Sequence, residues 1–183
     1  MRIEGYAVVG DNDCIADAAG AMPESLKNDA EWKFFQDGLD AADVTVLGRR
    51  SHDVTPNHRL RRRVVLTRSV SDVERNDLIV FWNPEGATLE AALAAFDDNV
   101  THLAVAGGRD VFDCFLTGPH HYTTFHLSRI RGITHPGGVG VFSEIDAKRQ
   151  TAEQVLSASG YIPGPTKTLD RGVDVVSWTP APN

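Results

Sequence analysis

Residues 21–35 join a loop to the start of a helix and place a carboxylate at the junction. Pro23 closes the loop, and Asp29 stands at the helix entrance, three residues before Trp32. A carboxyl group at the mouth of an apolar cleft is desolvated, which favours its protonated form near neutral pH. Reduction of a C=N bond needs such an acid, because nitrogen is protonated as hydride reaches carbon. The structural alternative is that Asn28 and Asp29 only cap the helix.

The elements that must position this carboxylate follow from the apolar pattern. Trp32, Phe35 and Leu39 recur at helical spacing and predict a helix over residues 29–39 with one apolar face. Short continuous apolar runs are typical of parallel strands buried on both faces. Residues 44–47 are read as such a run, and residues 3–9, 64–66, 78–81 and 103–106 are further predicted strands.

Further elements complete an alternating pattern. Thr88 and Thr151 are predicted N-caps of two helices, and a third helix opens at the Gly107-Gly108 pair. Residues 122–130 predict a longer, partly exposed strand. Residues 166–169 and 173–178, joined by a turn at Gly172, predict a terminal hairpin. The sequence therefore predicts an α/β chain.

Composition and charge exclude several classes of protein. The 183 residues, 42% of them hydrophobic, suffice to bury a core, and we expect one domain over residues 1–183. A net charge of −7 argues against nucleic-acid binding, which needs clustered Lys and Arg. No apolar run approaches the roughly 18 residues of a membrane span, and the chain start lacks a signal peptide's apolar core. The sequence therefore predicts a cytoplasmic protein with no membrane role.

Metal binding is not predicted. Cys14 and Cys114 are too few for a four-cysteine site or a disulfide framework, and the seven histidines are scattered. The sequence predicts a small-molecule substrate as the partner of this protein. The oligomeric state is not determined by the sequence, and a homodimer stays open.

Five short motifs resemble, in order and spacing, those of the dihydrofolate reductase family. They are A-M-P-x-x-L-x-x-D-x-x-W at 21–32, G-R-R-S at 48–51, L-T-R-S at 66–69, A-G-G at 106–108 and L-S-R-I at 127–130. Each match is weak alone, but five in register are strong evidence for the fold. The resemblance covers roughly residues 1–130 and implies a central, mostly parallel, twisted sheet of about eight strands, flanked by about four helices, with a C-terminal β-hairpin.

The resemblance implies an NADPH site built from the turns after several strands. Arginine beside hydroxyl groups at a strand's carboxyl end suits the 2′-phosphate that distinguishes NADP from NAD. Helix N-termini suit the other phosphates. The alternative is that Arg49 and Arg50 are simply solvated and bind no phosphate. The implied cofactor-binding residues are Ala7, Ile15, Gly48, Arg49, Arg50, Ser51, Thr67, Arg68, Ser69, Ala106, Gly107, Gly108, Arg109, Asp110 and Val111.

The resemblance also implies the catalytic and substrate-binding residues. Asp29 is the implied acid, with Ser128 hydrogen-bonding in support. Arg61 falls near the position where the family grips the glutamate carboxylate of folate, although a guanidinium fits a phosphate equally well. The implied substrate-binding residues are Ala7, Glu24, Leu26, Trp32, Lys33 and Arg61.

Two departures from the family bear on the substrate. Glu24 stands where the family has a tryptophan, and Lys33 where it has an aromatic residue; Lys33 can instead lie on the outer face of the helix. The resemblance implies a reductase of a C=N bond in a pterin, foremost 7,8-dihydrofolate. The alternative is reduction of a ribosylamino-pyrimidine phosphate in riboflavin synthesis, whose reductase has a similar glycine-rich segment at residues 134–142. A non-catalytic nucleotide- or pteridine-binding protein is the third hypothesis.

Overall fold

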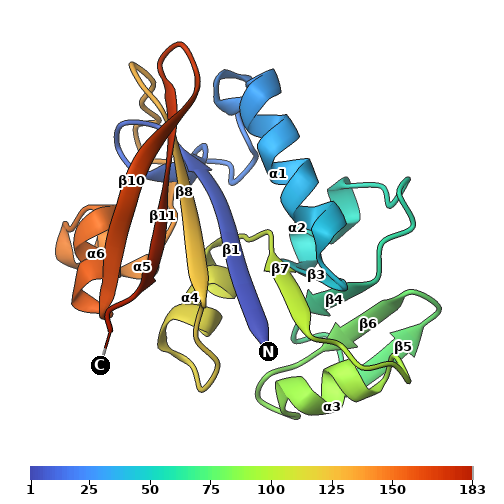
Figure 1. Cartoon of the computed structure of the whole chain (residues 1–183). Helices are drawn as coiled ribbons and strands as arrows, with labels where there is room; N and C mark the ends of the chain where they lie inside the picture. The colour runs from blue at the N-terminus through green and yellow to red at the C-terminus, as the bar shows by residue number, and fades with distance from the viewer. Residues whose placement is uncertain (183) are drawn as a thin grey trace.

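The computed structural model describes residues 1–182, which form a large central sheet and a small second one (Figure 1). The nine strands of the central sheet are β1 (Arg2–Val9), β3 (Val44–Gly48), β4 (Arg63–Leu66), β5 (Val73–Asn76), β6 (Ile79–Trp82), β7 (His102–Val105), β8 (Thr124–Ile130), β10 (Tyr161–Asp170) and β11 (Val173–Pro180). The second sheet pairs β2 (Cys14–Ala16) with β9 (Val139–Gly140). The helices are η1 (Glu24–Leu26, a 3-10 turn), α1 (Asp29–Ala41), α2 (Arg49–Val54), α3 (Leu89–Ala94), α4 (Arg109–Thr117), α5 (Ser143–Lys148) and α6 (Ala152–Ala158).

The first strand lies in the middle of the sheet, whose order is β10-β11-β8-β1-β7-β3-β4-β6-β5. The strands from β8 to β6 in this order run parallel, whereas β11, β10 and β5 are antiparallel to their neighbours. In Figure 1, β1 runs upward from the N-terminus, and both termini lie at the lower end of the sheet. Parallel strands end at one edge, so the turns after β1, β3, β4 and β7 gather there, where open α/β sheets bind ligands.

The α/β class, the largely parallel sheet and the C-terminal hairpin are confirmed, but the predicted element counts were too low. The described residues contain nine strands in the central sheet and six α-helices, where about eight and about four were expected. The strands that were missed are weak in sequence: β5 is mostly exposed, and β2 and β9 are three and two residues long. The hairpin begins earlier than predicted, at Tyr161. Asn183, the last residue of the predicted domain, lies outside the described residues.

The two faces of the sheet are packed very differently. The main apolar cluster includes residues of α3, α4 and α6, with Phe112, Phe125 and Phe142 stacked edge to face or tilted. The face under α1 has a much smaller cluster, whose buried members are Tyr6, Leu39 and Ala104. Helix α1 is therefore held on the sheet by little apolar surface. None of the helices in residues 1–182 is long and apolar enough to cross a membrane.

Gly38 shows how closely α1 approaches the sheet. A Cβ at Gly38 would lie 2.4 Å from Cζ of Tyr6. In an open helix, replacing glycine by alanine stabilises by about 1 kcal/mol. Here we expect Gly38→Ala to lower the free energy of unfolding by about 1–3 kcal/mol, because overpacking outweighs helix propensity. Denaturant titration measures the change.

The neighbouring variant Asp37→Ala is the control for Gly38→Ala. In the wild-type protein the exposed carboxylate of Asp37 pairs with Lys33 one turn away. We expect it to change the free energy of unfolding by less than about 1 kcal/mol. A Gly38→Ala protein at least as stable as wild type would show that α1 can move away from Tyr6 at no cost.

Candidate active site

A cavity of about 900 Å³ opens at the edge where the parallel strands end. Its walls come from the ends of β1, β3, β4 and β7, from α1 and from the loop after β2. Ligand sites have volumes of roughly 300–1,000 Å³, so the cavity can hold a dinucleotide together with a small ring.

All the residues predicted to bind a cofactor line this cavity. They are Ala7, Ile15, Gly48, Arg49, Arg50, Ser51, Thr67, Arg68, Ser69, Ala106, Gly107, Gly108, Arg109, Asp110 and Val111. The structure thus brings together turns that lie up to a hundred residues apart in the sequence. Their role in binding a cofactor stays a prediction.

The turn between β7 and α4 presents its backbone to the cavity. Gly107 has φ +95°, a conformation that favours glycine, and a Cβ there would lie 2.8 Å from the Phe112 ring. A Cβ at Gly108 would meet only Ile15, at 3.9 Å, so open space lies before this residue. The amides at the start of α4 can therefore be approached closely by an anion.

The arginines of the cavity differ in how far their charges are satisfied. Arg49 pairs with Asp53 at 2.8 Å, Arg109 pairs with Asp146 at 2.6 Å, and Arg50 donates to the backbone carbonyl of Ala19 at 2.5 Å. Arg68 is exposed and has no hydrogen bond or ion pair within residues 1–182.

Arg68 is flanked by two hydroxyl groups, whose oxygens lie 2.9 Å apart. They belong to Thr67 and Ser69. A free guanidinium beside two hydroxyl groups is a suitable partner for a phosphate monoester.

The prediction that Asp29 stands at the mouth of the cavity is wrong. Asp29 lies exposed in the first turn of α1 and does not line the cavity. Exposure removes the desolvation on which the prediction depended. Asn28 is the N-cap, because its side chain accepts hydrogen bonds from the amides of Ala30 and Glu31.

The buried carboxyl group that lines the cavity belongs to Glu31. It lines the cavity wall although the residue is only 5% exposed. Burial raises its pKa to about 7, against a smaller lowering by the nearby hydroxyl of Ser128. Residues two apart on a helix point about 200° away from each other, which explains why Asp29 faces solvent when Glu31 faces the sheet. The sequence analysis missed Glu31.

Of the predicted substrate-binding residues, Ala7 and Trp32 line the cavity and the other four do not. Those four have other surroundings. Glu24 is exposed and pairs with Lys27, Leu26 is fully buried, Lys33 pairs with Asp37 on the outer face of α1, and Arg61 is held by Asp40 and Gln36. Phe35 lines the cavity, as the alternative placement of Lys33 implies. Besides Glu31, the lining residues that the sequence analysis missed include Tyr6, Val8, Asn83, Pro84 and Glu85.

No family model matches the chain, and no curated protein matches it by sequence. Solved structures do match. A deaminase/reductase of Thermotoga maritima, named as acting on diaminohydroxyphosphoribosylaminopyrimidine and 5-amino-6-(5-phosphoribosylamino)uracil, is 15% identical with a TM-score of 0.66. The match covers 98% of this chain but 56% of that one, so the chain spans little more than half of its length.

Two further structures match over nearly their whole length. A putative riboflavin biosynthesis protein from a Shewanella species is 17% identical, with a TM-score of 0.65 and 98% of both chains covered. A pyrimidine reductase-like protein of Corynebacterium diphtheriae is 11% identical, with a TM-score of 0.70, covering all of this chain and 92% of the other. The TM-scores establish the shared fold, but at identities this low they do not establish the activity, which must be argued from the site. The chain has the dihydrofolate reductase-like fold that these proteins share.

Proposed function

We propose that the protein is an NADPH-dependent reductase of a pyrimidine compound, of the ribosylamino-pyrimidine phosphate type reduced in riboflavin synthesis. The observation that carries the proposal is Glu31, a buried carboxyl group in the cavity wall with a pKa of about 7. A carboxylic acid that keeps its proton near neutral pH is suited to general acid catalysis.

The cavity fits a dinucleotide. Gly108 leaves room for a close approach to the backbone, and Arg68 offers a charge that no residue of 1–182 pairs, which suits a 2′-phosphate. Ala7 and Ile15 would flank the nicotinamide, which supplies hydride when NADPH is bound. The length of cavity wall between these groups would hold the diphosphate and adenosine.

The residues of α1 and β1 would prepare the substrate. Glu31 would donate a proton to the substrate atom next to the carbon that receives hydride. Tyr6 and Phe35, which also line the cavity, would exclude water and cover the faces of a planar ring. Ser128 would keep the Glu31 carboxyl group oriented.

The pyrimidine substrate is favoured over 7,8-dihydrofolate, which the sequence had put first. The similar structures carry names of riboflavin-pathway or pyrimidine reductases. In addition, Arg61, implied to hold the glutamate of folate, is engaged by Asp40 and Gln36 outside the cavity wall.

The test is the loss of NADPH absorbance with purified protein and each candidate substrate in turn. Turnover with the ribosylamino-pyrimidine phosphate alone is the expected result. Turnover with dihydrofolate alone would restore the pterin hypothesis. Binding of NADPH without turnover of either would favour the non-catalytic protein of the same fold.

Arg68 gives a prediction about cofactor choice. We expect Arg68→Gln to raise the KM for NADPH about tenfold or more and to leave the KM for NADH unchanged, because only NADPH has the 2′-phosphate. A hydrogen bond to a charged group contributes about 1.5–3 kcal/mol, which corresponds to that factor. Initial rates with both nucleotides measure it.

The matched control is Arg75→Gln. Arg75 lies on β5, pairs with Asp97 at 2.6 Å and does not line the cavity. Arg75→Gln should leave the KM values for NADPH and NADH unchanged. If Arg68→Gln weakened NADPH and NADH equally, Arg68 would not be the residue that distinguishes the two nucleotides.

A further inference from the structure

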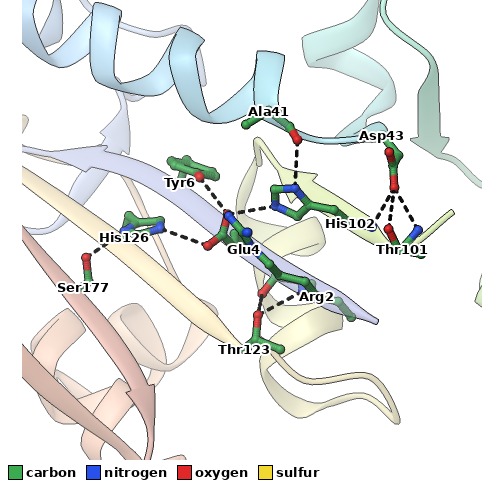
Figure 2. Close-up of polar contacts among 11 residues, drawn as sticks. Arg2, Glu4, Tyr6, Ala41, Asp43, Thr101, His102, Thr123, His126 and Ser177 are labelled. Atoms are coloured by element: carbon green, nitrogen blue, oxygen red, sulfur yellow. Dashed lines mark hydrogen bonds and ion pairs between the residues drawn. The ribbon is translucent and has the colours of Figure 1, made fainter.

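A buried carboxylate lies under α1. It belongs to Glu4 of β1, two residues before Tyr6, which lines the cavity. Glu4 is 7% exposed, and Figure 2 shows donors around it from three strands. Arg2 Nη2 and His102 Nε2 each lie 2.8 Å from its Oε2, and the Tyr6 hydroxyl donates to the same oxygen at 3.1 Å. Nε2 of His126 lies 3.8 Å from the other oxygen.

These donors keep Glu4 ionised. Burial by itself raises the pKa of Glu4, but hydrogen bonds from His126, Arg2, His102 and Tyr6 together outweigh it and hold the pKa well below its usual range. A buried charge with this many partners is a fixed point in the sheet, because removing any partner leaves desolvation uncompensated.

His102 connects this fixed point to α1. Its Nε2 faces the carboxylate of Glu4, and its Nδ1 lies 3.1 Å from the carbonyl oxygen of Ala41, the last residue of α1. Both ring nitrogens therefore face acceptor oxygens, so the imidazole of His102 bridges the buried carboxylate of β1 and the end of α1.

Two carboxylates lie around His102. The backbone amide of His102 donates to the carboxylate of Asp43 at 3.0 Å, so two carboxylates, from Glu4 and Asp43, lie beside it. The other titratable side chains gathered at this cluster are Arg2 and Tyr6 of β1 and His126 of β8.

Tyr6 links the same cluster to the cavity wall. Its hydroxyl is bound to Glu4, and its ring stacks on His126 with centroids 4.7 Å apart. On its α1 side the ring meets Phe34 and Phe35, at 5.9 and 6.4 Å. Tyr6 lines the same cavity as Glu31, so the buried charges behind Tyr6 hold this part of the cavity wall in place.

The weak apolar packing under α1 makes these polar contacts decisive. Only Tyr6, Leu39 and Ala104 are buried in the apolar cluster of that face, whereas the opposite face holds the main core. Phe34 and Phe35 of α1 pack against this cluster but are only partly buried. Burial of apolar surface contributes about 25 cal/mol per Å², so with so small a cluster the hydrogen bond at Ala41 helps to fix the position of α1.

We propose that Glu4 and His102 are positioning residues: they fix Tyr6 and the end of α1 on the sheet, and thereby set the place of Glu31 in the cavity. This inference rests on the proposed function in taking Glu31 as the acid. The cluster would then affect turnover in addition to stabilising the fold.

The first test is His102→Gln, which removes the imidazole bridge. We expect kcat to fall about 10- to 100-fold, the loss typical of a misplaced catalytic group, while the KM for NADPH stays unchanged. Tyr6→Phe, which removes only the hydroxyl link to Glu4, should lower kcat in the same direction.

The control is Val155→Ala, a truncation in the core under α6, far in the sequence from α1 and outside the cavity wall. It destabilises by about 1–3 kcal/mol without touching the cluster. It should leave kcat unchanged at a temperature where all variants are folded. If it lowered kcat as much as His102→Gln, the cluster would have only a structural role, and the proposal would be overturned.

NMR provides a readout that needs no substrate. His102→Gln should shift the backbone amide signals of Glu31 and Trp32. Unmoved amide signals would overturn the proposal. If the wild-type protein turned over no candidate substrate, the proposed function would fail, and these amide shifts would still decide whether the cluster positions α1.

Discussion

Replacing Glu31 by glutamine is expected to lower turnover about a hundredfold or more while leaving NADPH binding within about twofold of wild type. General acid catalysis contributes typically 10²–10⁴-fold, and the amide cannot donate a proton in the acid's place. Glutamine keeps the shape of the side chain, so the cavity wall is preserved. Steady-state rates and cofactor fluorescence titration measure the two effects.

The matched control for Glu31→Gln is Asp29→Asn. Both residues are acidic and lie in the first turn of α1, but Asp29 is exposed and outside the cavity wall. Asp29→Asn should retain the wild-type kcat. If it abolished turnover and Glu31→Gln did not, the acid would be the residue that the family motif implies, and the orientation of α1 during catalysis would differ from that in the structure.

Glu31 also makes turnover and stability depend on pH, and the sign of each change can be derived. In the wild-type protein, kcat should fall as the pH rises above about 7, because the acid must be protonated. The free energy of unfolding also depends on the protonation of the Glu31 carboxyl group. Since its folded pKa, about 7, exceeds the ordinary 4.5, its contribution is fully present below about pH 4.5 and is lost as the pH rises through 7. That loss is on the order of 3 kcal/mol at pH 8, and Glu31→Gln should not show it.

The apolar pattern predicted much of this site, because most of it is built from turns between buried strands. Each continuous apolar run became a parallel strand, and the glycine and arginine turns after them meet at one edge of the sheet. Glu31 was also within reach of the sequence. It lies four residues before Phe35 and eight before Leu39, so helical spacing alone places it on the apolar face of α1, whereas Asp29 lies on the opposite side.

The cluster around Glu4 could not be predicted from the sequence. His102 is the one polar residue of β7, and His126 lies in β8 among both apolar and polar residues. Nothing near either histidine in the sequence suggests a partner. Glu4 and His102 are 98 residues apart and meet only because β7 pairs with β1 in a register that opposes Arg2 to His102. That register depends on the order of the strands in the sheet, which local patterns do not contain.

Arg129→Ala is expected to lower the free energy of unfolding by about 3–5 kcal/mol. The guanidinium of Arg129, on β8, donates to the carbonyl of Gly10 at 2.6 Å and to the carboxylates of Asp13 and Glu153 at 2.5 Å each. The Asp13 side chain is only 7% exposed, so truncation of the arginine leaves a nearly buried charge without its cationic partner. Denaturant titration with unchanged m-value measures the loss.

The matched control for Arg129→Ala is Arg131→Ala, two residues further along the chain. Arg131 forms its ion pair with Asp174 at 2.8 Å, but its side chain is 65% exposed. Asp174 keeps the hydrogen bond from the Thr168 hydroxyl once Arg131 is removed, so the expected loss is at most about 1 kcal/mol. The comparison separates burial from pairing, since both arginines contact carboxylates at similar distances. Equal losses in the two variants would mean that Asp13 is hydrated once Arg129 is removed, and that the segment after β1 opens to water when its guanidinium is absent.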